Sequence, residues 1–514
     1  MSVWSLVCKL PSRAQGIAAA GSILALAGCA VGPDFKQPSP PQVSGYATRP
    51  LPAQTVAANV AGGSAQRFID GGDITGDWWT LFHSPPLNAL IVRALAHNPD
   101  LKAAQAALRA ARETTRAGRG AYYPSVSAGA SASREQDPPG ALAPVPSNNA
   151  FLYNLYTPQV SVSYVPDVFG LNRRTVESLK AQEQAVRFQT IATANTVTSN
   201  VVVAAIQMAA LQDQIDATRQ IIDANAKMLR IAQYQFDKGY ASGLDLAAQK
   251  SQVAQVQASL PPLLKQLAQQ QHLLAILTGR FPSQAPAEKF TLSSLHLPQE
   301  LPLSLPSKLV QQRPDVRQAQ AAMHAASAQI GVAVANRLPD IELSANVGST
   351  ALRIAQVFKS GTGFWSLGAD LTAPIFQGGT LLHQERAAKA AYAQSAQLYR
   401  STVLTAFQNV ADTLSALEQD AAALKAAAAA DSAAKDTLDL AQRQWHAGYS
   451  DYLTLQNAEQ AWQQARINLV QAQADRYSDT AALFQALGGG WWHRDDENDA
   501  ASIQTNSKRQ DHDQ

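Results

Sequence analysis

The sequence contains one arrangement twice: a helical pattern, a proline, and then a strand pattern. The first copy begins at Pro99 and its second proline is Pro124; the second copy begins at Pro314, 215 residues later, and its second proline is Pro339. Before that second proline the apolar residues recur at helical spacing, and after it they alternate as in a strand with one apolar face. Two long copies are too few for a solenoid, so the sequence predicts a duplicated domain.

The predicted helices are unusually long. Residues 172–237 contain neither Pro nor Gly, and 381–446 form the matching stretch, with shorter helices predicted at 244–277 and 452–487. Within the long stretches, apolar residues alternate gaps of three and four, which indicates a heptad seam and left-handed supercoiling. The seam positions are Val201, Ala204, Met208, Leu211, Ile215, Thr218, Ile222, Asn225, Leu229, Ala232 and Phe236, and then Val403, Phe407, Val410, Leu414, Leu417, Ala421 and Leu424. At 1.5 Å per residue each long helix would measure on the order of 100 Å.

Four runs alternate apolar and polar residues. They are centred on Val126–Ala132, Val160–Tyr164, Ile341–Val347 and Trp365–Ala373. Their lengths approach the 9–11 residues of a membrane-spanning strand, although a small soluble sheet would show the same alternation. Strand edges cannot be left open in lipid, and about eight strands make the smallest closed barrel. Four strands per chain are too few, so several copies would have to share one barrel.

The first residues resemble an export signal. Lys9 and Arg13 precede an apolar stretch that is too short to span a bilayer. It ends in Leu26-Ala27-Gly28-Cys29, which resembles a bacterial lipobox. This resemblance implies cleavage before Cys29 and S-diacylglycerol and N-acyl groups on that residue; the alternative is an ordinary signal peptide with an incidental cysteine. Ala30 follows, without the aspartate of an inner-membrane retention signal, which favours the outer membrane.

Composition excludes several classes of function. Only 16% of residues are charged and the net charge is +2, with no basic block of the kind that binds nucleic acid. We find no metal-spaced histidine pair and no nucleophile motif, so we expect neither an enzyme nor a metal or cofactor site. No segment after the signal is expected to form a transmembrane helix. Trp78-Trp79 is interpreted as an anchor of the N-terminal segment, with a binding platform as the alternative.

These features together resemble the TolC-like outer-membrane efflux channels, in the lipoprotein (NodT/OprM-like) branch. The resemblance covers about residues 29–492 and is carried by the lipobox, Val31-Gly32-Pro33-Asp34-Phe35, Trp78-Trp79, Asn98-Pro99-Asp100-Leu101, the turns at Phe169 and Phe376, and Ala486–Trp491. It implies a homotrimer in which four strands per chain form one twelve-stranded barrel that continues into a long α-helical coiled-coil tunnel. It also implies docking on a periplasmic adaptor and an inner-membrane RND pump, with drugs, toxic organics or metal ions as exported molecules. A duct for type I protein secretion and a non-conducting lipoprotein scaffold remain alternatives.

The expected organisation divides the chain into six segments. They are a signal peptide (1–28), a lipidated N-terminus and extended tether (29–76), a first efflux repeat (77–279), a linker (280–305), a second repeat (306–492) and a polar disordered tail (493–514).

The same resemblance implies a gate after the second glycine turn, at Gly448. It assigns Leu453 to the apolar constriction and Asn457 to a position where relatives usually carry a carboxylate, with Thr454 at a second such position. Asp451 and Asp245 are the nearest acids. We hypothesise that Leu453 packing closes the gate and that Asn457 forms a neutral clasp. The alternative is that Leu453 and Leu455 are ordinary seam residues and that Asn457 is solvated.

Overall fold

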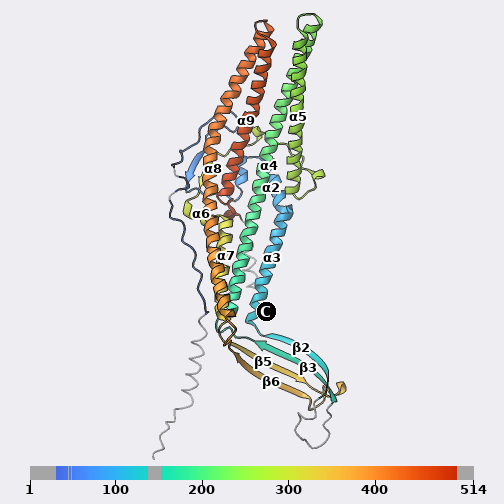
Figure 1. Cartoon of the computed structure of the whole chain (residues 1–514), viewed down its shortest axis with the longest axis vertical. Coiled ribbons are helices and arrows are strands. Elements are labelled where there is room, and N and C mark those ends of the chain that lie inside the picture. Colours follow the sequence, from blue (N-terminus) through green and yellow to red (C-terminus); the bar gives the residue numbers. More distant parts are fainter. Residues whose placement is uncertain (1–29, 44, 48, 137–151, 495–514) are drawn as a thin grey trace, which may run out of the picture. The chain divides into compact units, whose positions relative to one another are not determined.

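The structure is a computed structural model that describes residues 30–43, 45–47, 49–136 and 152–494 (Figure 1). The predicted signal peptide, Cys29 and the tail from residue 495 therefore lie outside the described residues. The chain divides into two compact units. Unit 1 comprises residues 1–37, 109–185 and 320–398, and unit 2 comprises 38–108, 186–319 and 399–514.

The described chain is mainly helical. Its α-helices are α2 (Pro85–His97), α3 (Pro99–Arg119), α4 (Leu171–Asp237), α5 (Gly243–Leu277), α6 (Pro306–Gln312), α7 (Pro314–Ala335), α8 (Thr380–His446) and α9 (Tyr452–Ala486). Its strands are β1 (Arg67–Asp70), β2 (Ser125–Gln136), β3 (Leu152–Tyr164), β4 (Glu300–Leu303), β5 (Asp340–Ser349) and β6 (Gly363–Thr372). Short 3₁₀ helices include Trp78–Phe82 and Trp491–His493.

The predicted duplication is confirmed by the helices themselves. α4 and α8 each contain 67 residues, and α5 and α9 each contain 35. The turns between them use glycine in the left-handed region, at Gly239 (φ 77°) and Gly448 (φ 75°). Glycine populates this region readily, so each long helix ends sharply and the chain reverses into the shorter one.

Unit 1 contains the four predicted strands in one antiparallel sheet of order β2-β3-β5-β6 (Figure 1). Two strands are longer than the sequence indicated, since β2 continues to Gln136 and β3 already begins at Leu152. Pro158 and the run of residues before it do not alternate, which concealed this part of the strand. β2 and β6 are the two edges of the sheet within one chain.

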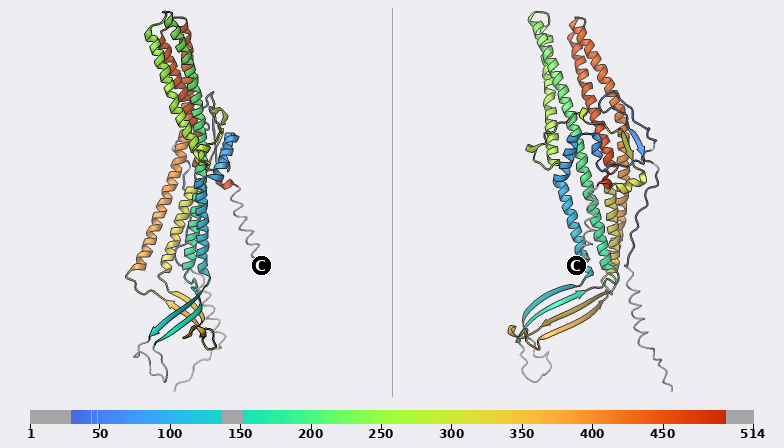
Figure 2. Two further views of the ribbon diagram at one scale, coloured as in Figure 1. Left: turned by 90° about the vertical axis from the view of Figure 1, so that its right-hand side faces the viewer. Right: turned by 180° about the vertical axis from the view of Figure 1, so that it is seen from behind.

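Unit 2 contains the apolar core. Within this unit, α4 from residue 186 with α5, and α8 from residue 399 with α9, run side by side (Figure 2). Most of the predicted seam is buried, including Val201, Ile215, Val410 and Leu414. Trp78 stacks on Phe484 of α9 with ring centroids 5.2 Å apart and is 1% exposed, which confirms the predicted anchoring role over a binding platform.

Two features of unit 2 were not predicted. β1 and β4 pair as a short parallel sheet, although the sequence placed them in the tether and the linker. His493 closes the last 3₁₀ helix, and its Nε2 lies 2.8 Å from Oδ2 of Asp73. The predicted polar tail, which began at His493, therefore begins after this residue.

The sequence predicted no transmembrane helix after the signal. This prediction was wrong, because α4 is long enough and apolar enough to meet the criteria for one. Within the described residues, α4 contains an 18-residue window with a mean hydropathy of 1.3. In the structure 72% of that window is buried. Packing of α4 into the protein core accounts for the apolar run.

Candidate functional site

The strand register places apolar side chains on one face of the sheet. Val126 pairs with Val162, Val162 with Ala345, and Ala345 with Leu367, so one apolar row crosses all four strands. The neighbouring row, on the opposite face, consists of Ser127, Ser161, Asn346 and Ser366. The apolar face is open to the surroundings of the chain, with Leu367 77% and Trp365 75% exposed. A sheet with one open apolar face and one polar face has the chemistry of a barrel wall between lipid and water.

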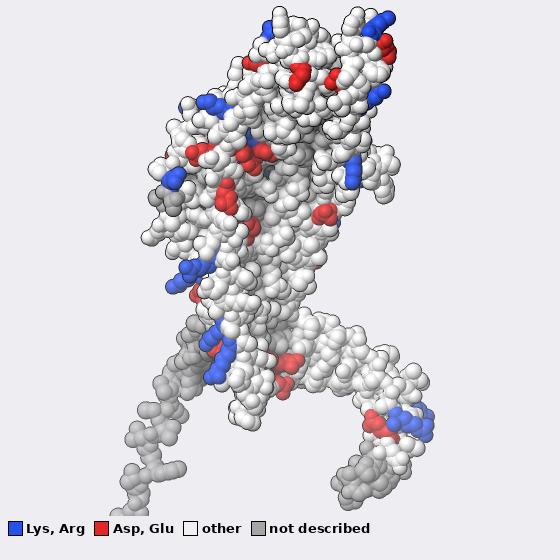
Figure 3. Space-filling model, turned by 45° about the horizontal axis from the view of Figure 1, so that its top comes forward, with Lys and Arg blue, Asp and Glu red and all other residues white. Residues whose placement is uncertain are grey.

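Charged residues are confined to the ends of this sheet. Figure 3 shows an uncharged surface along the strands, with acidic and basic side chains only toward either end. Within the described strands of the sheet the charged residues are Arg134 and Glu135 near the end of β2, Asp340 and Glu342 at the start of β5, and Asp370 near the end of β6. The uncharged middle matches the apolar band that a strand needs to cross lipid.

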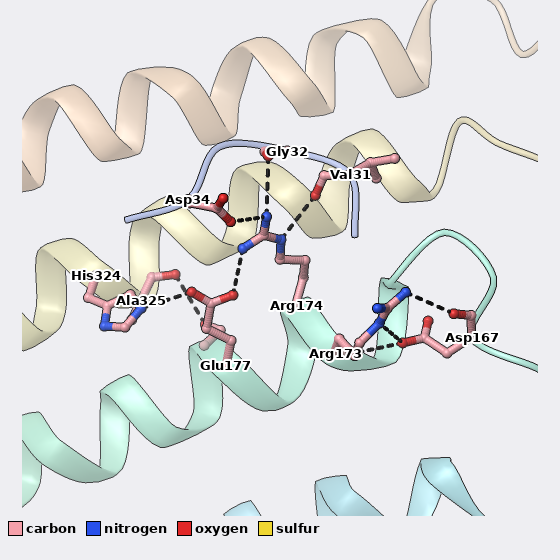
Figure 4. A network of polar contacts seen from close by, with 10 residues as sticks. Val31, Gly32, Asp34, Asp167, Arg173, Arg174, Glu177, His324 and Ala325 are labelled. Carbon is pink, nitrogen blue, oxygen red and sulfur yellow. Dashed lines mark hydrogen bonds and ion pairs between the residues drawn. The ribbon is translucent and has the colours of Figure 1, made fainter. Parts of the chain in front are cut away.

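The segment after the expected lipidation site is held by Arg174 of α4 (Figure 4). This guanidinium donates from Nε to the Val31 carbonyl (3.0 Å) and from Nη2 to the Gly32 carbonyl (3.2 Å) and Asp34 Oδ1 (2.8 Å). Its Nη1 donates to Glu177 Oε2 at 2.8 Å. The Arg174 side chain is only 6% exposed. Such charge-assisted bonds are among the strongest hydrogen bonds in proteins, so Arg174 fixes the N-terminal segment.

Close packing supports the same segment from the other side. Phe35 stacks on His324 of α7 at 4.4 Å, and His324 Nε2 lies 2.9 Å from Glu177 Oε1. Gly32 has φ 94°, and a Cβ there would stand 2.4 Å from the Gly331 backbone. We call residues 31–35 with Arg174, Glu177 and His324 the N-terminal clamp. The Val31–Phe35 motif is visible in the sequence, whereas Arg174 follows no periodic pattern that would have indicated its role.

The gate residues that the resemblance assigned lie on α9. Leu453 is 60% exposed, and Thr454 and Asn457 are exposed as well, whereas Leu455 is fully buried. In the single chain, Leu453 therefore does not belong to the buried seam. Its exposed side chain is available for the predicted constriction with neighbouring chains.

The two nearby acids cap helices. Asp451 accepts from Thr454 N (2.8 Å) at the start of α9, and Asp245 forms a capping box with Ser242 at the start of α5. Hydrogen bonds from the Thr454 hydroxyl and amide lower the pKa of Asp451. Both carboxylates thus have a structural role at the helix N-termini.

Comparisons with known proteins agree with this architecture. The sequence profile of the family "Outer membrane efflux protein" matches residues 90–280 and 305–489. The chain is 29% identical over 486 residues to the probable efflux pump outer membrane protein TtgC of Pseudomonas putida, which covers 93% of this chain and 96% of that protein. It is 30% identical over 429 residues to the pyoverdine export outer membrane protein OpmQ of Pseudomonas aeruginosa, covering 82% of this chain and 89% of that protein.

Solved structures show the same fold. The outer-membrane channel OprN superposes with a TM-score of 0.79 at 26% identity, covering 90% of this chain and 100% of that one. The open state of the Neisseria gonorrhoeae MtrE outer membrane channel superposes with a TM-score of 0.75 at 25% identity, covering 90% and 99%. The predicted fold class, outer-membrane location and efflux function are confirmed. The chain therefore belongs to the outer membrane efflux protein family and is an outer-membrane channel of an efflux system.

Proposed function

We propose that three copies of the chain form one twelve-stranded barrel and one helical tunnel, through which small molecules leave the cell. The observation that carries this proposal is the apolar row from Val126 to Leu367, which crosses a sheet that one chain leaves open at β2 and β6. Unpaired strand edges are too costly in lipid, so neighbouring copies have to supply the missing partners. The number three comes from the family resemblance.

The pump partners follow from the same resemblance. We propose a periplasmic adaptor and an inner-membrane RND pump as the other components, because relatives are named as efflux pump outer membrane proteins. Names of relatives refer to toluene, antibiotics and pyoverdine, which favours small organic molecules as the exported class. In this proposal the protein transports without catalysing a reaction, and it needs no cofactor beyond its lipid.

The lipid is proposed on Cys29, which becomes the first residue after cleavage. The N-terminal clamp supports this, because it fixes residues 31–35 directly after that position. Two or more acyl chains would anchor the segment stably, at about 0.8 kcal/mol per buried CH₂. Cys29→Ser should abolish palmitate labelling while the assembled fraction stays in the membrane through its barrel. Cys8→Ser, inside the expected signal peptide, should keep the label; label retained in Cys29→Ser would contradict the assignment.

The channel proposal is tested by mass and by conductance. The detergent-extracted protein should have three times the chain mass, and it should conduct ions in planar bilayers once the tip is opened by Leu453→Ser. In a strain lacking its own outer-membrane efflux channel, the protein expressed with a matching pump and adaptor should restore resistance to small organic toxins. A stable, well-folded monomer would remove the shared barrel from consideration.

A further inference from the structure

A layer of polar side chains interrupts the apolar packing between the helices near the α4–α5 and α8–α9 turns. The surrounding cluster in unit 2 is apolar and comprises Met228, Leu438, Ala441, Leu455 and Ala458, with Trp445 and Trp462 packed on it. Asn225 of α4, Gln249 and Gln252 of α5, and Glu459 of α9 are buried beside this cluster. Buried polar groups in a coiled-coil seam reduce stability and are best explained by specificity or switching.

Hydrogen bonds in this layer join the two hairpins. Gln252 Oε1 accepts from Gln456 Nε2 and from Gln460 Nε2, both at 3.1 Å, which connects α5 to α9. Gln249 Nε2 donates to the Asn225 carbonyl at 3.0 Å, which connects α5 to α4. The carboxyl of Glu459 on α9 forms a side-chain hydrogen bond with Asn225 of α4, which places it in the same layer.

Glu459 is buried, at 6% exposed, with no cationic partner among the described residues. Only burial and a hydrogen bond with Asn225 act on the pKa of its carboxyl. Burial raises the pKa of Glu459 to about 7, and a hydrogen bond with Asn225 only partly offsets this rise. A buried carboxylate without a counter-charge is costly, so the packed arrangement favours the neutral acid.

The other titratable groups do not compensate for its charge. Tyr452 of α9 faces both Glu459 and Asp245 of α5; burial first, and then these two charges, raise the pKa of Tyr452. On α9 itself, Arg466 pairs with Asp431 of α8, with Nη1 3.5 Å from Oδ2. The charged side chains that flank the layer on the other helices are exposed, namely Asp223, Lys227 and Arg230 on α4, Lys250 on α5, and Lys435, Asp436, Asp439 and Arg443 on α8. Gln249 Oε1 is buried without a hydrogen-bond partner among the described residues. The layer therefore contains an unused hydrogen-bond acceptor for the O–H of a protonated carboxyl.

We propose that Glu459 is a proton-sensitive joint between the two helical hairpins, whose neutral form keeps α9 packed against α4 and α5 and whose ionisation favours an open tip. Leu453 and Asn457 precede Glu459 on the same helix, so loosening of α9 would move both. The inference rests on the proposed channel function and adds a regulatory device to it.

The direction of the effect follows from linkage. A carboxyl whose pKa is raised in the packed state stabilises that state at low pH and loses this contribution as the pH rises through about 7. If the opened tip returned Glu459 to its ordinary pKa of 4.5, the ratio of open to closed tips would rise about tenfold per chain between about pH 6 and 8. This is an upper bound, because partial opening restores only part of the solvation.

The test is conductance of the full-length protein in planar bilayers as the pH is raised from about 5.5 to about 8.5. The unmodified protein should open increasingly with pH, and Glu459→Gln, which cannot ionise, should remain closed across the range. Asp439→Asn, an exposed acid near the end of α8, is the matched control and should behave like the unmodified protein. A Glu459→Gln variant that keeps the original pH profile would overturn the proposal.

Two further measurements separate the possible failures. Leu453→Ser should conduct at every pH, and a Leu453→Ser variant that does not conduct would contradict the channel function itself. If Leu453→Ser conducts but the unmodified protein shows no response to pH, only the proposed role of Glu459 is overturned. Melting temperatures of the detergent-extracted protein verify folding. Glu459→Gln should melt higher than the unmodified protein at about pH 8 and equally at about pH 5.

Discussion

Glu342 lies directly opposite Asp370 in the β5–β6 ladder, so two acidic side chains share the polar face of the sheet. The hydroxyl of Ser163 donates to Glu342 Oε1 at 2.7 Å from the neighbouring strand. Like charges directly opposite one another destabilise a sheet, so their presence at this end of the strands calls for a functional reason. In a shared barrel each additional chain would add another pair to the lumen.

We therefore expect Asp370→Asn to lower the cation selectivity of the open channel and to leave the sheet at least as stable. The measurement is the reversal potential across a bilayer with a salt gradient, in the Leu453→Ser background. Glu135→Gln is the control, because Glu135 lies at the opposite end of the sheet beside Arg134. An unchanged reversal potential in Asp370→Asn would show that selectivity arises elsewhere.

A charge on the two faces of β6 should have very different effects. Leu367→Arg places a cation on the apolar face and should cost roughly 2–4 kcal/mol near the membrane midplane, which impairs assembly. Ser366→Arg places the same cation on the polar face and should be tolerated better. Yields of assembled oligomer from the outer membrane compare the two. Equal damage on both faces would contradict the registry of the strands.

The gate assignment predicts opposite chemistry at two positions of α9. Leu453→Ser should increase conductance because it removes the apolar closure, and Asn457→Asp should increase cation selectivity because it adds a ring of carboxylates. Leu483→Ser is the matched control: Leu483 of α9 is fully buried and lies 30 residues after Leu453, so its loss should reduce stability without opening the tip. If neither Leu453→Ser nor Asn457→Asp changes conductance or selectivity, the gate lies elsewhere.

The N-terminal clamp predicts a local effect of Arg174→Met. Removal of the guanidinium eliminates its bonds to Val31, Gly32 and Asp34, so residues 31–35 should exchange amide hydrogens faster. Arg173→Met is the control, because Arg173 pairs with Asp167 and not with the N-terminal segment. Hydrogen exchange followed by mass spectrometry measures the difference, while palmitate labelling should persist in both variants. Equal protection of residues 31–35 in Arg174→Met and Arg173→Met would contradict the clamp.

The buried position of Asp420 on α8 predicts a second effect of pH, which concerns the thermal stability of the protein and not its conductance. Burial first, and then a hydrogen bond with Asp479, raise the pKa of Asp420 from 3.8 to about 7. Its contribution to stability is therefore complete below the ordinary value and is lost as the pH rises through about 7. Asp420→Asn should reduce the fall in melting temperature between about pH 5 and 8, and Asp412→Asn, which is exposed, should not.

The sequence predicted the long helices and their ends because the signals there are local. Gly239 and Gly448 interrupt long stretches free of Gly and Pro, and the heptad seam of the first stretch continues to Phe236, three residues before Gly239. The pairing of β1 with β4 was missed because both strands are short and their partners, such as Arg67 and Glu300, are far apart in the chain. Short strands carry too few residues to show a period.

The functional residues were predicted unevenly for the same reason. Motifs indicated Val31–Phe35 and the α9 gate positions, but Arg174 is one of many helical arginines until the fold brings it to Asp34. The spacing does indicate Glu459, because it lies four residues after Leu455 and three before Trp462. An acidic residue therefore occupies a seam position that is normally apolar. Its significance depends on burial and on missing counter-charges, which only the packed helices define.

The equal lengths of α4 and α8, and of α5 and α9, restrict how such a protein can change in size. One residue inserted into a helix rotates everything beyond it by about 100°, which turns seam residues toward solvent. An insertion in one half alone would also raise one hairpin turn above the other. Variants that reach a longer or shorter distance should therefore arise by whole heptads, gained or lost in both halves together.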